Sequence, residues 1–65
     1  MAEYPWRHWS LALALLSAAE STPAIADRLL AEAQAELDRL PAEARSARRC
    51  QMLQGLIADA RRAGR

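Results

Sequence analysis

The stretch PAIADRLLAEAQAELDRLPAEARSARRCQMLQGLIADARRA, residues 23–63, decides the fold. Apolar and small residues recur in it at steps of four and three, which keeps them on one stripe of a helix, as in the seam of a coiled coil. One series precedes Pro41 and the other follows it: Ala26, Leu30, Ala33, Leu37 and Leu40, then Ser46, Cys50, Leu53, Ile57 and Ala60. The pattern predicts helices over about residues 23–39 and 42–63.

Pro41 joins these two predicted helices over a very short connection. Proline is tolerated in the first turn of a helix, so we expect the chain to fold back there as an antiparallel helical hairpin. Charge supports the pairing: residues 20–43 hold six acidic and two basic residues, a net of −4, and residues 44–65 hold six basic and one acidic, a net of +5. The alternative to a hairpin is a single bent helix that continues through Pro41. The alternative to charge pairing is that these charged residues only form the solvent-exposed faces of the two helices.

A third helix, predicted over about residues 5–19, is apolar on two sides. Its two faces, nearly opposite at about 100° per residue, are Trp6, Trp9, Leu13 and Leu16 and, near His8, Leu11, Leu15 and Ala18. A helix that is apolar all round is normally buried all round, whereas one hairpin covers only one face. We therefore expect a homodimer, a six-helix bundle with this helix at the interface. A groove on another protein or a membrane surface are the alternatives.

Composition limits the fold and the chemistry. The chain has 65 residues, 52% hydrophobic and 26% charged, which fits one small folded domain over residues 1–65. Sixteen Ala and ten Leu stand against only three β-branched residues, so the predicted fold class is all-α. One Cys and one His exclude a disulfide framework and an ordinary structural zinc site. We expect no metal and no cofactor.

His8 and Cys50 are the residues that could form a nucleophile–base pair. No Gly-rich turn accompanies them, and a bundle of this size has no deep pocket, so we expect no enzymatic activity. Cys50 is interpreted instead as a buried, unreactive residue of the seam. Gly55 indicates either close contact with the N-terminal helix or a weak point within its own helix.

Residues 11–19, LALALLSAA, resemble the apolar region of a secretory signal. Glu3 beside Arg7 argues against a signal, and the run is much shorter than the ~20 residues that a membrane span needs. We therefore expect a cytoplasmic protein with no membrane span. The basic residues are all Arg and Ala is abundant, which indicates a GC-rich genome and a bacterial source.

Aromatic and basic residues outside the seams point to protein binding. Trp, Tyr and Arg dominate binding hot spots, and an apolar centre with a charged rim is typical of a protein interface. The predicted partner-binding residues are Tyr4, Trp6, Trp9, Leu13, Arg45, Arg48, Arg49, Met52 and Leu56. The expected function is that of a small regulator, inhibitor or chaperone that binds a larger protein. In the alternative interpretation, the Trp rings only cover the end of the bundle, and Met52 and Leu56 pack beneath the N-terminal helix.

Arg45, Arg48 and Arg49 also allow a nucleic-acid interpretation, because a helix-turn-helix protein contacts bases from the start of its second helix. The turn before them lacks the usual Gly and is too tight for a near-perpendicular crossing. The net charge is only +1, and the acidic residues of the preceding helix partly neutralise the three Arg. Nucleic-acid binding is therefore the less favoured function.

Residues 24–63 resemble the small helical-hairpin co-chaperones of type III secretion needle subunits. The likeness lies in the length of the hairpin and in its Ala/Leu pattern. It implies a helical-hairpin chaperone of a secretion apparatus, and the aromatic N-terminal helix departs from that family. A tetratricopeptide unit is a second comparison, but its pattern of small and large residues does not align with this sequence.

Overall fold

The computed structural model describes residues 6–63, and every regular element within them is a helix. The elements are α1 (Trp6–Ser21), the 3-10 helix η1 (Pro23–Ile25), α2 (Ala26–Asp38), α3 (Ala42–Arg45) and α4 (Arg48–Ala63). The all-α prediction is confirmed for this range. Tyr4 and the predicted helix start at residue 5 lie outside the described residues.

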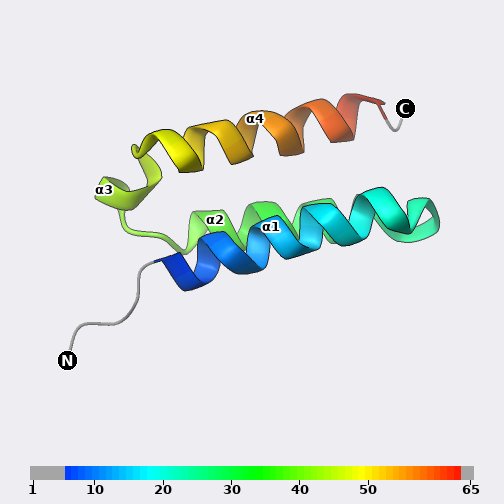
Figure 1. Cartoon of the computed structure of the whole chain (residues 1–65), viewed down its shortest axis with the longest axis horizontal. Coiled ribbons are helices and arrows are strands. Elements are labelled where there is room, and N and C mark those ends of the chain that lie inside the picture. The colour runs from blue at the N-terminus through cyan, green and yellow to red at the C-terminus, as the bar shows by residue number, and fades with distance from the viewer. Residues whose placement is uncertain (1–5, 64–65) are drawn as a thin grey trace.

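α1 and α2 form an antiparallel pair, and α4 lies alongside them (Figure 1). The chain turns through Thr22 and η1, so α2 runs back against α1. After α3 the chain reverses again, and α4 runs in the same direction as α1. α1 contacts α2 most extensively, whereas α4 packs mainly on α2 and touches α1 less. The contact between α1 and α4 is the least extensive of the three, and the candidate site lies along it.

Two prolines mark the places where the chain reverses. Pro23 is the first residue of η1, whose turn is closed by the Ile25 N–H donating to the Thr22 carbonyl at 3.2 Å. Pro41 precedes α3 in an extended conformation, with φ −63° and ψ 156°. Because an extended residue cannot continue a helix, the chain leaves the direction of α2 there and restarts as α3.

The single helix predicted over residues 42–63 is two helices, α3 and α4. At the break, the Ser46 hydroxyl donates to the Glu43 carbonyl at 2.8 Å, and the Ala47 N–H donates to the Ala44 carbonyl at 3.1 Å. Serine hydroxyls that bond to nearby backbone compete with the helix, and bonds over three residues tighten a helix end. The prediction of one uninterrupted helix after a tight turn was therefore wrong: α2 and α4 are joined through α3.

The core consists of the predicted seams together with one stripe of α1. Its members are Ala12, Leu16, Ala19, Leu30, Ala33, Leu37, Leu40, Cys50, Leu53 and Ile57. From the two seams, Ala26 and Ala60 are partly buried and Ser46 is exposed. Ala12 and Ala33 are fully buried, and such short side chains let packed helices approach closely. The four-three spacing thus predicted the core correctly on α2 and α4.

Cys50 and Gly55 have opposite environments on α4. Cys50 is fully buried, as predicted. This burial raises the pKa of its thiol, and the nearby positive charge of Arg49 opposes the shift. At Gly55 an added Cβ would meet nothing within 4 Å, so close backbone contact with α1 is excluded and the glycine is a weak point in the helix.

Candidate protein-binding groove

A shallow apolar groove lies between α1 and α4. Its lining residues, two from α1 and four from α4, are Trp9, Leu13, Arg49, Met52, Leu53 and Leu56, and they surround a volume of about 190 Å³. The groove exists because α4 packs mainly on α2, which leaves one flank of α4 facing a flank of α1. All the lining residues except Arg49 are apolar, so the groove suits an apolar side chain and not a polar substrate.

Three large apolar side chains in this groove are exposed to solvent. Leu13 is 41% exposed, Leu56 is 52% exposed and Met52 is 64% exposed. Single exposed apolar residues are ordinary on a protein surface, whereas several that gather in one place mark an interaction site. We refer to Leu13, Met52 and Leu56 as the apolar triplet.

Tryptophan and arginine close one end of the groove. The Arg49 guanidinium lies 4.4 Å from the centre of the Trp6 ring and 5.5 Å from that of the Trp9 ring. The Trp9 indole N–H also donates to the Arg49 carbonyl at 3.1 Å. A cation over aromatic faces is attracted by about 0.5–1 kcal/mol when exposed. These contacts tie the start of α1 to the start of α4 and place a positive charge at this end.

The other end of the groove is acidic. Leu13 and Leu56 also line a second depression of about 450 Å³, which continues along the same two helices past Glu20 and Asp59. Asp59 forms an exposed ion pair with Arg62, one turn further along α4. The surface between α1 and α4 therefore runs from a basic end at Arg49, across the apolar triplet, to an acidic end that holds Glu20 and Asp59, of which Asp59 is paired with Arg62.

The structure brings together six of the nine predicted partner-binding residues. Around the groove and its basic end lie Trp6, Trp9, Leu13, Arg49, Met52 and Leu56. Arg45 is on α3, Arg48 is the first residue of α4, and both are exposed without lining the groove. The three Arg residues grouped by the sequence argument thus occupy two helices, with Arg49 engaged by the Trp rings.

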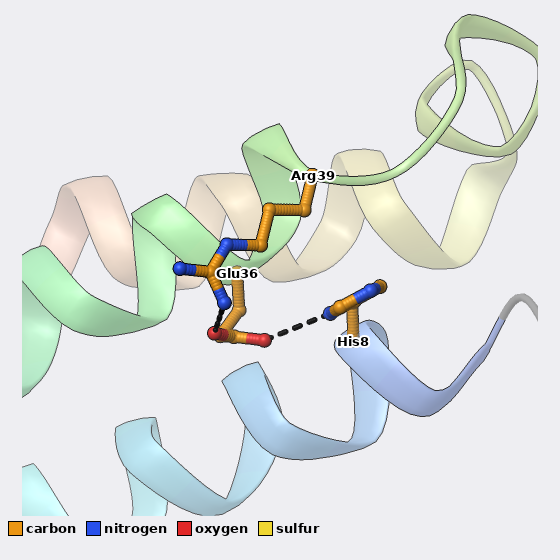
Figure 2. Close-up of polar contacts among 3 residues, drawn as sticks. All are labelled: His8, Glu36 and Arg39. Atoms are coloured by element: carbon orange, nitrogen blue, oxygen red, sulfur yellow. Dashed lines mark hydrogen bonds and ion pairs between the residues drawn. The ribbon is translucent and has the colours of Figure 1, made fainter.

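A polar cluster on the other side of α1 was not predicted (Figure 2). The His8 Nδ1–H donates to Glu36 Oε1 at 2.9 Å, and the Arg39 guanidinium donates to Glu36 Oε2 at 2.8 Å. This cluster fastens α1 to α2. A sequence signal for it existed: in an antiparallel pair that turns at Thr22, residues equally far from the turn face each other, and His8 and Glu36 are both fourteen residues away.

The metal-ligand clusters and the His8–Cys50 pair that the sequence raised can be checked in the described residues. Within residues 6–63, no group of three or more His, Cys, Asp and Glu side chains could hold a metal ion. His8 is bonded to Glu36, Cys50 is in the core, and no hydrogen bond joins the two in this range. No helix in the described range is long and apolar enough to cross a membrane.

Comparison with known proteins gives no relative for the chain. No family model matches it, and no curated protein and no solved structure matches it either. The resemblance to secretion co-chaperones therefore stays a prediction. Function has to be argued from the groove itself.

Proposed function

We propose that this protein is a non-enzymatic interaction module, which binds a larger protein through the groove between α1 and α4. The observation that carries the proposal is the apolar triplet, three large side chains exposed side by side in one groove. A chain of this size has few apolar residues to spare from its core. Exposing three of them together is consistent with a surface that is buried on binding.

The shape of the groove suits an amphipathic helix as the bound segment. Two helices with a furrow between them accept a third helix whose apolar face lies in the furrow. The charged ends favour one direction: a bound helix with an acidic residue near Arg49 and a basic residue near Glu20 pairs with both ends. A small regulator, inhibitor or chaperone acts in this way, by binding a helix of its target protein. We place this function in the bacterial cytoplasm.

Photo-crosslinking from the groove tests the proposal. A photoreactive amino acid replaces Leu56 in one variant and Ala58 in a matched control, because both positions are exposed on α4 but lie about 200° apart around the helix. In the source cell we expect an adduct with one larger protein from position 56 and none from position 58. The same adducts from both positions, or none from position 56, would contradict groove binding.

The nucleic-acid alternative has less support from the described residues. Arg49 stacks on the Trp rings, and the break before α4 places Arg45 on α3, apart from Arg48 and Arg49 on α4. A reading helix needs its basic side chains together at one groove of the duplex. Tight binding of duplex DNA with a steep dependence on salt would restore this alternative.

A further inference from the structure

We infer that a second copy of this chain occupies the groove, in antiparallel orientation, whenever the larger protein is absent. The inference rests on the proposed function, since it takes the groove to be a surface that binds helices. It specifies the homodimer expected from the sequence: the interface is the α1–α4 groove, and a two-fold axis passes near Leu13 and Leu56.

The charges of the groove are complementary to themselves when the groove is turned end for end. Arg49 marks the basic end and Asp59 the acidic end, ten residues or about 15 Å apart along α4. A two-fold rotation about the middle of the groove brings Arg49 of one copy to Glu20 and Asp59 of the other, and does so twice. A parallel second copy would instead place Arg49 beside Arg49. Opposite charges steer association and fix its direction.

The apolar triplet lies between these charges, where the two-fold axis falls. In a two-fold interface the same patch contacts itself, so Leu13, Met52 and Leu56 of each copy are covered by the triplet of the other. A chain of this size gains more from such burial than a large protein does, because its own core is small. The groove therefore has an apolar centre and a charged rim, as protein interfaces do.

The opposite flank of α1 does not have this symmetry. Its surface toward α2 is lined by Leu11, Leu15, Glu32, Ala35, Glu36 and Arg39. Glu36 is only 15% exposed and is already paired with His8 and Arg39. A second copy on this flank would meet a Glu36 whose two oxygens are both engaged within the chain. In the groove, Asp59 is likewise paired with Arg62, and Glu20 is the carboxylate that remains for Arg49 of the second copy. The α1–α4 groove is the surface that selects a second copy.

Dimer formation and binding of the larger protein then exclude each other. Both use the apolar triplet, which cannot face two partners at once. The dimer keeps the triplet out of water until the larger protein is present, and it must separate before that protein binds. The measurable consequence is competition: partner binding weakens as the concentration of this chain rises above its dimer dissociation constant.

A charge-swap experiment tests the antiparallel dimer. Glu20→Arg and Arg49→Glu are made as separate chains and examined by sedimentation equilibrium, alone and mixed. Each variant alone faces two repulsive contacts, so we expect its dimer to be weaker by about tenfold or more. In the mixture the contacts between positions 20 and 49 are attractive again at both ends, so a heterodimer stronger than either homodimer is expected. Arg61→Glu, an exposed reversal on α4 outside the groove lining, is the matched control and leaves the dimer unchanged.

A second variant guards against misfolding. Arg49→Glu also removes the stack on Trp6 and Trp9, whereas Leu56→Asp changes only an exposed residue at the predicted axis. Leu56→Asp is expected to be monomeric and to keep the wild-type circular dichroism spectrum. A wild-type chain that stays monomeric at high micromolar concentration overturns the inference, and so does a dimer that neither the charge reversals nor Leu56→Asp weakens.

The inference and the proposed function fail in different ways. If the protein is monomeric but still crosslinks to one larger protein from position 56, the dimer inference is wrong and the proposed function stands. If the protein dimerises as described but crosslinks from position 56 only to its own chain, the dimer inference stands and the proposed function is wrong.

Discussion

α1 packs against α2 and against α4 in different ways. Against α2 it buries short side chains such as Ala12, and the His8–Glu36 bond fastens the outer edge. Against α4 it is held at one end, where Trp9 bonds to the Arg49 carbonyl, and the middle leaves the apolar triplet exposed. In this small chain, the buried packing contact and the exposed apolar triplet thus occupy separate sides of one helix. Substitutions on the two sides should therefore have separable effects.

The largest effect is expected in the core that α1 and α2 share. Leu37 is fully buried, and Leu37→Ala should lower the free energy of unfolding by about 2–5 kcal/mol. A core of this size supplies only about 3–5 kcal/mol, so we expect the variant to be largely unfolded at room temperature. Far-ultraviolet circular dichroism measures this directly. A variant that melts at the wild-type temperature would show that the core is placed wrongly.

Cys50 tests the core on the α4 side. Cys50→Ala should cost about 1 kcal/mol, as a modest core truncation, and urea unfolding measures it. Because burial raises the pKa of the thiol, the folded chain keeps this proton to higher pH than the unfolded chain does. The stability linked to Cys50 is therefore complete below the pKa of the unfolded thiol and is lost as pH rises toward that of the folded thiol.

Two controls distinguish the ionisation of the Cys50 thiol from the loss of core packing in Cys50→Ala. Cys50→Ala should lack the part of the alkaline decline that belongs to the thiol, while both proteins share the rest. A thiol reagent should label native Cys50 slowly and react faster as urea opens the core. Rapid labelling of the native protein would place Cys50 at the surface and contradict its position in the seam.

Gly55 should give a gain of stability. Nothing lies within 4 Å of an added Cβ there, and alanine in a helix interior is favoured over glycine by about 1 kcal/mol. Gly55→Ala should therefore raise the free energy of unfolding by up to about that amount, measured by urea titration. A loss of stability would mean that α4 approaches another helix at this point.

The smallest effect on stability is expected at Leu56. It is a leucine like Leu37, but in the folded monomer it is largely exposed. Leu56→Ala should change the free energy of unfolding in dilute solution by no more than about 0.5 kcal/mol. The same variant should weaken self-association and crosslinking from the groove, because it truncates the apolar triplet. If every loss of binding tracks a loss of folded protein, the groove is part of the core and not a binding surface.

The sequence was sufficient for the buried positions of α2 and α4, because four-three spacing follows directly from helix geometry. It was insufficient for α1, where the large residues Trp6 to Leu16 suggested two opposite apolar faces. The buried stripe runs through Ala12, Leu16 and Ala19. Of these only Leu16 belongs to a predicted face, because alanine gives little hydrophobic signal although it permits the closest packing.

The break at Ser46 and Ala47 was also beyond the sequence. Both residues are tolerated in helices, so the pattern does not show that the Ser46 hydroxyl bonds to the Glu43 carbonyl where the helix ends. Arg45 was grouped with Arg48 and Arg49 on the assumption of one continuous helix, and the break places Arg45 on α3 and the other two on α4. The groove residues were found because exposed apolar side chains off the seam are visible in the pattern itself. Their role in binding stays a prediction.

The tie between Trp9 and Arg49 has a consequence for selectivity. Within the described residues it supplies the hydrogen bond that links α1 and α4, and it lies near the start of both helices. Beside this tie a hydrogen bond sets the spacing of α1 and α4, whereas toward Glu20 no hydrogen bond of the described residues joins the two helices. Met52, a flexible side chain that adapts to irregular shapes, lines the groove next to Arg49. For the binding that we propose, we therefore expect stricter discrimination of a docked segment beside Arg49 than toward Glu20.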